Sequence, residues 1–325
     1  MEETIFEQRT DIAELSLAIQ RLQAEISKII VGQDEMVRLM MAAILADGHV
    51  LIEGVPGVAK TLTARLLSKC LQTGFSRIQF TPDLMPSDVL GTNIFNPGTS
   101  SFEYKRGPVF SNMVLIDEIN RAPAKTQAAL FEVMEERQVT SDGITHKMAA
   151  PFMVIATQNP IEQEGTYRLP EAQLDRFLFK IVVPYPSEAD EVNILHRFNN
   201  ITTANALETV TAVLSGNDII QYRQIIKSVL IEDKLLQFIA KIVVSTRTDR
   251  SVYLGASPRA SLSIMNAAKA FAVISGRDFV TPDDIVMAAT PVLRHRIILT
   301  PEREMEGTKE DEVIQKIING IEIPR

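Results

Sequence analysis

One short stretch, residues 49–61 (HVLIEGVPGVAKT), constrains the fold of this chain more than any other. Residues 50–52 are apolar and largely β-branched, as in a strand that is buried on both faces. Residues 54–59 follow as a loop, and Lys60 and Thr61 begin a helical pattern. A strand, a glycine loop and a helix start together form a cradle whose backbone N–H groups face an anion. In such a cradle, Lys60 reaches the β- and γ-phosphates of a nucleotide and the Thr61 hydroxyl binds Mg²⁺.

The loop departs from the usual phosphate-binding pattern at Ala59, where that pattern has glycine. Alanine is the smallest possible change from glycine, but its Cβ atom makes a positive φ costly there. On the loop alone, a glycine turn without a ligand therefore stays an alternative.

Length and charge limit the classes of protein to consider. The 325 residues suit two domains better than one, and an apolar fraction of 46% is enough for real cores. The 33 Lys and Arg residues stand against 41 Asp and Glu residues, which gives a net charge of −8. This balance argues against a dedicated nucleic-acid binder, although a local basic pore is not excluded.

Cysteine, histidine and the apolar runs indicate a reducing compartment. The single cysteine, Cys70, falls on the apolar side of the helix after the loop and is interpreted as a buried small hydrophobe. The acidic N-terminus lacks the order of a signal peptide, and the longest uncharged apolar run, 39–46, is too short to span a bilayer. We therefore expect a cytoplasmic protein without membrane insertion. The histidines lack metal-ligand spacing; they are His49, His146, His196 and His295.

Five strand candidates alternate with helical or irregular segments, which predicts an α/β fold with a central parallel sheet of five strands. Ligands of such sheets lie beyond the carboxyl ends of the strands, so the residues just after each strand are the most informative. The candidates cover residues 50–52, 75–80, 113–116, 152–156 and 179–183.

Two inserted hairpins and a helical C-terminal half complete the predicted architecture. The hairpins are expected at about 92–112, with an Asn-Pro-Gly turn, and at 137–148, with an Asp-Gly turn. We therefore divide the chain into an α/β core, residues 1–187, and an all-helical lid, residues 188–325. Apolar periodicity predicts helices at 10–30, 36–46, 188–198, 218–229, 233–246, 257–275 and 282–296.

The apolar strand at 113–116 ends in two carboxylates, Asp117 and Glu118. At the end of a core strand, Asp117 can hold Mg²⁺ and Glu118 can polarise an attacking water. Together with the phosphate loop, this pair predicts a nucleoside triphosphate site. GTP is disfavoured because the sequence has no Asn-Lys-x-Asp stretch to read guanine.

Three further polar residues are candidates for the same chemistry. Asn159 follows the strand at 152–156 and can orient the lytic water, or else makes an Asx turn before Pro160. Arg176 directly precedes the last strand and could complete the site of a neighbouring subunit in trans. Arg259 falls in the first turn of a helix, where a cation is unfavourable unless an anion lies there. That position favours a phosphate sensor over a salt bridge.

These motifs together resemble those of AAA+ ATPases, and their particular residues are similar to those of the MoxR family. The resemblance covers the α/β core densely and the lid through one motif. Its members are residues 53–61 (EGVPGVAKT), 80–88 (FTPDLMPSD), 115–123 (LIDEINRAP), 156–160 (ATQNP), 163–177 (QEGTYRLPEAQLDRF) and 255–260 (GASPRA).

The resemblance implies a role for each matching residue. Lys60 and Thr61 belong to Walker A, Asp117 and Glu118 to Walker B, and Thr61 and Asp117 are the Mg²⁺ ligands. Asn159 resembles sensor 1, Arg176 the arginine finger and Arg259 sensor 2, and Arg121 is a further residue that could act between subunits. The hairpins resemble insertions that line the pore of a ring. The nucleotide contacts implied are Val31, Gly32, Gly54, Val55, Pro56, Gly57, Val58, Ala59, Lys60, Thr61 and Leu62.

The family likeness implies a homo-hexameric ring motor that binds ATP and Mg²⁺ between core and lid, and hydrolysis would move the lid against the core. It also implies chaperone-like work with a von Willebrand factor A-type partner in maturation, metal insertion or complex assembly. A DNA-remodelling motor is one alternative, disfavoured by the acidic charge and by the hairpin near residue 142, which carries few charges. A slow nucleotide-gated binding scaffold is another, disfavoured by the full set of catalytic candidates.

Overall fold

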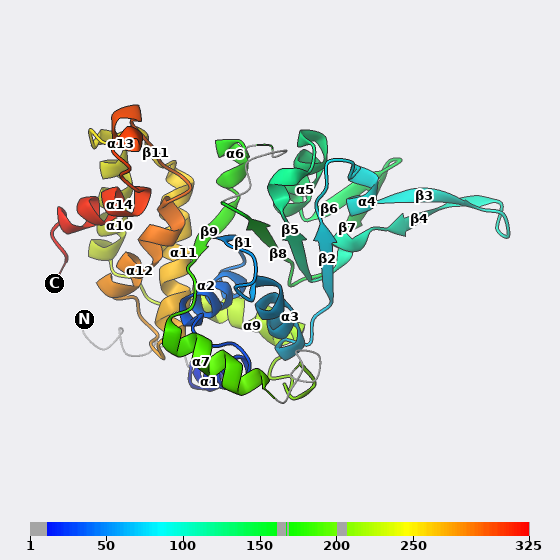
Figure 1. The fold of residues 1–325 in the computed structure, drawn as a ribbon, viewed down its shortest axis with the longest axis horizontal. Helices are drawn as coiled ribbons and strands as arrows, with labels where there is room; N and C mark the ends of the chain where they lie inside the picture. Colours follow the sequence, from blue (N-terminus) through cyan, green and yellow to red (C-terminus); the bar gives the residue numbers. More distant parts are fainter. Residues whose placement is uncertain (1–11, 161–166, 168, 200–206, 325) are drawn as a thin grey trace, which may run out of the picture.

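The five predicted strands form one parallel sheet in the order β2-β5-β8-β1-β9 (Figure 1). The computed structural model describes residues 12–160, 167, 169–199 and 207–324. The α/β fold class predicted from the sequence is confirmed. The strands are β1 (His49–Gly54), β2 (Phe75–Gln79), β5 (Met113–Asp117), β8 (Met153–Gln158) and β9 (Phe177–Val183).

Alternate residues of each strand point to opposite faces of this sheet, and both faces are covered. Val50 and Ile52 of β1 belong to a hydrophobic cluster with α2 (Asp34–Leu45) and α3 (Lys60–Cys70). Leu51 belongs to a second cluster with α5 (Ala124–Glu136). Burial on both faces explains why the strands read as continuous apolar runs in the sequence.

The first helix, α1 (Ala13–Ser27), packs its apolar stripe on the body of the protein. Leu15, Ile19, Leu22 and Ile26 recur at steps of three and four and are all buried in the first cluster. Cys70, at the end of α3, is also buried there, and burial raises the pKa of its thiol to about 11. Both observations agree with core roles.

Both predicted hairpins are present. The first, β3 (Gly91–Asn96) with β4 (Ser101–Arg106), follows the short helix α4 (Pro86–Leu90) and projects from the body (Figure 1). The second pairs β6 (Gln138–Ser141) with β7 (Ile144–Lys147). The side chain of Asn93 donates to Asp142, so the base of one hairpin contacts the turn of the other.

The C-terminal half is mainly helical, as predicted, but it also contains a small sheet. Its two short strands, β10 (Val252–Leu254) and β11 (Ile298–Leu299), pair antiparallel and are too short to give a sequence pattern. The helices are α7 (Glu188–Phe198), α9 (Gly216–Lys227), α10 (Asp233–Thr248), α11 (Pro258–Ile274), α12 (Pro282–Leu293), α13 (Pro301–Met305) and α14 (Glu310–Asn319).

One hydrophobic cluster runs without a break from α1, through one face of the sheet, to α14. It includes residues on both sides of the predicted boundary at 187/188, so that division stays a prediction. Within the described residues, no helix is long and apolar enough to cross a membrane.

Candidate functional site

The loop between β1 and α3 lies where the sequence predicts an anion cradle. Gly57 has a φ of 90° with no atom near the position of an added Cβ, and Ala59 has a φ of 59°. Ala59 thus takes the backbone conformation that is costly for alanine. The backbone N–H and the hydroxyl of Thr63 both donate to the Ala59 carbonyl, at 2.9 and 3.0 Å, and fix this start of the helix. The left-handed conformation costs an alanine roughly 1–2 kcal/mol, which suggests that the loop geometry is needed.

Lys60 is the charged group of this cradle. Its Nζ donates to the Gly54 carbonyl at 2.5 Å, and no described carboxylate forms an ion pair with it. Burial lowers the pKa of Lys60, and the charges of Asp117 and Glu118 oppose that shift. A half-buried ammonium bound only to a neutral carbonyl is suited to a phosphate ligand. Thr61 and Leu62 follow in the first turn of α3.

The carboxylate of Asp117 lies at the carboxyl end of β5 and is held from two sides. Its Oδ1 accepts from the Thr157 hydroxyl at 3.1 Å, and its Oδ2 is 2.5 Å from Nε of Arg77 on β2. The same Thr157 oxygen accepts from the backbone N–H of Glu118 at 3.1 Å. Thr157 thus fixes both acidic residues, a role that its place directly after an apolar run did not reveal.

Glu118 has a left-handed backbone, with a φ of 57°, which turns its side chain away from the line of β5. Its Oε2 accepts from Gln79 Nε2 at 3.0 Å and is 2.9 Å from Nε of Arg121. Arg121 was predicted to act between subunits, but in the single chain it contacts Glu118. The sequence did not single out Gln79, which reaches Glu118 from the end of the neighbouring strand.

Asn159 comes directly after β8, the strand that lies between β5 and β1. The register pairs Glu53 with Gln158, so Asn159 leaves the sheet beside the start of the phosphate loop. Lys60, Glu118 and Asn159 therefore follow the carboxyl ends of three adjacent strands, and their roles stay predictions. The chemistry of this donor set suits Mg²⁺ bound to a triphosphate, because Mg²⁺ uses one or two carboxylates and phosphate oxygens. The described residues contain no group of three metal-ligating side chains.

The segment predicted on the adenine side, Val31 and Gly32, joins α1 to α2. Gly32 has a φ of 70°, and an added Cβ would lie 2.7 Å from Cγ of Asp190 on α7. Gln33 donates to the Pro184 carbonyl at 3.4 Å. This segment is therefore packed closely against α7 and the end of β9, and only glycine fits at position 32.

Arg176 lies at the opposite end of the sheet from the phosphate loop. It precedes β9, whose first residue, Phe177, pairs with His49 at the start of β1. Lys60 follows the other end of β1, and the six residues of that strand span roughly 20 Å. The structure thus separates Arg176 from Lys60 of the same chain.

Arg259 lies at this same amino end, beside Arg176. The two arginines share one carboxylate of α5: Glu135 Oε1 is 2.9 Å from Nη2 of Arg259, and Oε2 is 3.8 Å from Nε of Arg176. Arg176 also donates to the Phe131 carbonyl. In the single chain the salt-bridge alternative for Arg259 is therefore the one present, and a role as phosphate sensor stays a prediction.

Arg296 fixes the backbone around Arg176 and was not predicted. Its side chain is only 2% exposed, and its Nε is 2.6 Å from Asp175 Oδ1. It also donates to the carbonyls of Asp175 and Phe177, at 3.0 and 2.7 Å. These bonds hold the residues on either side of Arg176 from the helical half of the chain.

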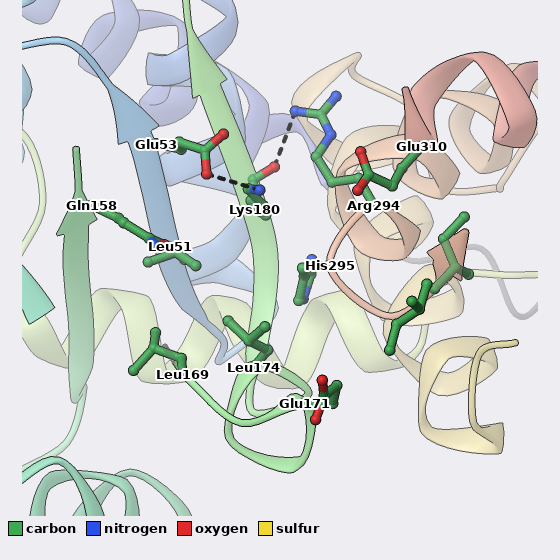
Figure 2. Close-up of a pocket in the computed structure, with 12 residues that line it drawn as sticks. Leu51, Glu53, Gln158, Leu169, Glu171, Leu174, Lys180, Arg294, His295 and Glu310 are labelled. Carbon is green, nitrogen blue, oxygen red and sulfur yellow. Dashed lines mark hydrogen bonds and ion pairs between the residues drawn. The ribbon is translucent and has the colours of Figure 1, made fainter. Parts of the chain in front are cut away.

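A second link between the two halves reaches the strand that enters the phosphate loop. Figure 2 shows Lys180 of β9 between Glu53 of β1 and Arg294, which follows α12. Lys180 Nζ is 2.9 Å from Glu53 Oε2, and Arg294 donates to the Lys180 carbonyl at 3.2 Å. The side chains surround a cavity of about 190 Å³ that His295 also lines. Lys180 thus contacts both Arg294 and the residue before Gly54.

Comparisons with known proteins agree with this architecture. Residues 49–179 match the family described as ATPase family associated with various cellular activities (AAA), and residues 244–317 match the AAA lid domain. A crystal structure from Cytophaga hutchinsonii, described as that of a candidate ATPase, superposes with a TM-score of 0.89 at 41% identity, covering 99% of each chain. The fold is that of an AAA+ ATPase.

Similar sequences give the narrower family. The chain is 44% identical to Chaperone MoxR1 of Mycobacterium tuberculosis over 316 residues, which cover 94% of this chain and 82% of that protein. It is 47% identical to the uncharacterised protein YeaC of Bacillus subtilis, covering 92% of each, and 31% identical to Protein MoxR of Methylorubrum extorquens, covering about nine-tenths of each. The chain belongs to the MoxR family of AAA+ ATPases.

Proposed function

We propose that this protein hydrolyses ATP with Mg²⁺ and uses the energy to remodel partner proteins. The observation that carries the proposal is the convergence of Lys60, Asp117 and Glu118 at the carboxyl edge of one sheet. Two of these side chains are carboxylates held by several neighbours, and the third is a half-buried cation without a carboxylate partner among the described residues. This is the arrangement that phosphoryl transfer to water requires.

The substrate-binding roles follow from the chemistry of each group. The loop N–H groups from Gly54 to Ala59 and the Lys60 ammonium bind the phosphate oxygens, and the segment of Val31 and Gly32 contacts the base. The Thr61 hydroxyl and the Asp117 carboxylate hold Mg²⁺. When bound, this cation neutralises charge that develops on the phosphate oxygens.

Hydrolysis needs a water oriented in line with the bond to be broken. Glu118 accepts a hydrogen bond from this water, and Asn159 orients it from the next strand. The water oxygen forms a bond to the γ-phosphorus as the bond to the β–γ bridging oxygen breaks, and ADP leaves with the bonding electron pair. The proton of the water passes to Glu118 or to the released phosphate.

A ring explains why two arginines lie at the far end of the sheet. In the ring that we propose, the amino end of the sheet in one subunit faces the phosphate loop of the next. Arg176 then acts in trans, where an arginine finger contributes about 10³–10⁵ in rate, and Arg259 acts as a phosphate sensor. The hexamer is carried over from the family resemblance.

The cellular role proposed is that of a chaperone. A close relative is named Chaperone MoxR1, and the family resemblance adds a von Willebrand factor A-type partner and work in maturation, metal insertion or assembly. The projecting β3–β4 hairpin exposes Phe95 and Phe102, which suits contact with another protein. A cytoplasmic location fits this role.

Steady-state phosphate release tests the proposal. Glu118→Gln should retain ATP affinity and lose at least about 100-fold in turnover, because the amide cannot accept the proton. Glu312→Gln on α14 is the matched control and should keep full turnover. A pull-down with the Glu118→Gln protein in ATP would then identify the partner. Unchanged turnover in Glu118→Gln would remove this residue from the mechanism.

A further inference from the structure

Arg296 is a buried cation at the amino end of the sheet, and each of its three guanidinium nitrogens donates hydrogen bonds. The residue follows α12, and its Nε is 2.6 Å from Asp175 Oδ1. Its Nη2 donates to the carbonyls of Asp175 and Phe177, and its Nη1 donates to that of Leu178 at 3.2 Å. The three residues that it contacts lie on both sides of Arg176 in the sequence.

The same guanidinium also binds the helical half of the chain. Its Nη1 donates to the Val292 carbonyl in the last turn of α12 at 2.5 Å, and its Nη2 donates to the Ser263 hydroxyl of α11 at 3.4 Å. Arg296 thus joins α11 and α12 to the segment that carries Arg176. Because a guanidinium is planar and presents its N–H donors in fixed directions, several such bonds together fix the position of the groups that accept them.

The carboxylate of Asp175 has a partner on its second oxygen as well. Its Oδ2 accepts from the Ser257 hydroxyl at 3.3 Å, and Ser257 lies two residues before Arg259 at the start of α11. Each oxygen of this carboxylate is therefore held, and the side chain is only 23% exposed. Asp175 thus connects the backbone next to Arg176 with both Arg296 and α11.

The guanidinium of Arg176 is partly exposed, whereas the backbone on either side of it is bonded to Arg296. Its side chain donates to the Phe131 carbonyl and lies 3.8 Å from Glu135. A group that contacts a ligand across a subunit boundary needs a head that can reach the ligand and a base that does not shift. Arg176 has both properties, and Arg296 supplies the second.

The stability of the fold gives little reason for a charged side chain at this place. Burial lowers the pKa of the Arg296 guanidinium, the hydrogen bond and charge of Asp175 oppose this shift, and the charge of Arg259 adds to it. A buried ion pair often stabilises a fold no better than apolar side chains of similar size. The exact placement of the bonded backbone is a better reason for keeping the pair.

We propose that Arg296, through its pair with Asp175, is a positioning residue that holds Arg176 in place for the nucleotide of a neighbouring subunit. This inference rests on the proposed function, because Arg176 meets that nucleotide only in the proposed ring. Arg296 acts through the groups that it binds and does not itself contact the nucleotide. A change in the pair should therefore impair Arg176 of its own chain and leave the phosphate loop of that chain intact.

Phosphate release and calorimetric titration with ADP test the proposal. Asp175→Asn removes the charge that pairs with Arg296. We expect turnover to fall at least about tenfold, because Arg176 is no longer held in place, and ADP affinity to stay within about twofold. Asp311→Asn is the matched control, since it removes the carboxylate 2.9 Å from Arg294, another arginine that follows α12, and it should keep full turnover.

Mixed assemblies separate a positioning role from a general loss of structure. Lys60→Ala subunits have a defective phosphate loop but an intact Arg176, so mixing them with Asp175→Asn should restore part of the turnover. A chain that is merely misfolded would not be rescued in this way. Arg296→Lys keeps the charge but has one nitrogen in place of three, and we expect the same loss and the same rescue.

A milder variant covers the case in which changes in the buried pair unfold the chain, which thermal unfolding would detect. Ser257 is exposed and its side chain makes no capping bond to α11, so Ser257→Ala removes only its bond to Asp175. Turnover should fall about two- to fivefold, with the same rescue. Unchanged turnover in every variant that folds, or a loss that Lys60→Ala subunits do not rescue, would overturn the proposal.

Arg176→Ala, measured alongside, separates a failure of this inference from a failure of the proposed function. If Arg176→Ala loses turnover and the folded Asp175→Asn and Arg296→Lys proteins do not, only the positioning role is wrong. If Arg176→Ala keeps its turnover, the proposed role of Arg176 in trans fails, and the positioning role fails with it.

Discussion

The two ends of the central sheet carry charged groups in opposite arrangements. At the carboxyl end, Asp117 and Glu118 are held in place by Thr157 and Gln79, and Lys60 contacts only a carbonyl. At the amino end, Arg176 and Arg259 both lie near a single acid, Glu135. One end thus has a cation suited to an anionic ligand, and the other has two arginines gathered on one carboxylate. The proposed ring would bring these two ends together at the junction between two chains.

The largest expected effect concerns Arg176. Arg176→Ala should retain nucleotide affinity and lose about 10³–10⁵ in ATP turnover if the arginine acts in trans. Phosphate release measures the loss, and mixing this variant with Lys60→Ala should restore part of the activity, because mixed rings contain intact junctions. If mixed assemblies form but activity is not restored, Arg176 does not act on the phosphate loop of a neighbouring subunit.

A smaller effect is expected at the carboxyl end. Thr157→Val keeps the shape of the side chain but removes the hydroxyl that holds Asp117 and Glu118. We expect turnover to fall roughly ten- to 100-fold, since a hydrogen bond to a charged group contributes about 1.5–3 kcal/mol. Thr157→Ser, which keeps the hydroxyl, is the matched control and should stay near the original rate. Equal rates in both variants would mean that the hydroxyl is not needed.

A substitution of Glu135 tests whether this carboxylate positions Arg176 and Arg259 for catalysis or only forms salt bridges with them. Glu135→Gln should change the free energy of unfolding by less than about 1 kcal/mol, because the group is substantially exposed. Turnover should fall only a few-fold, far less than in Arg176→Ala. Denaturant unfolding and phosphate release measure the two quantities. If Glu135→Gln and Arg176→Ala changed the free energy of unfolding alike and neither changed turnover, the amino end of the sheet would have only a structural role.

The smallest change is expected at Ala59. Ala59→Gly removes the Cβ atom from a residue with positive φ and should stabilise the fold by no more than about 1 kcal/mol, because glycine also costs more backbone entropy. Urea midpoints measure this difference. A loss of stability would mean that the Cβ atom makes packing contacts that outweigh its strain.

The sheet and the cradle could be predicted because their signals are local. Strands buried on both faces give apolar runs, and the Asp-Gly turn marks the hairpin at Asp142. The partners of the acidic pair could not be predicted in this way, because Thr157 and Gln79 lie on other strands and no local signal pairs them with Asp117 and Glu118. The contacts of Glu135 with Arg176 and Arg259 also join segments far apart in sequence, and only tertiary packing brings them together.

The hydrophobic cluster that passes from α1 to α14 has a consequence for how such a motor could move. A cap on a flexible hinge would swing freely, whereas helices that interlock with the sheet resist opening, since separation would expose close-packed side chains to water. Nucleotide-driven motion in this protein is then expected to be a short sliding of helices over one another, amplified only at the projecting hairpin.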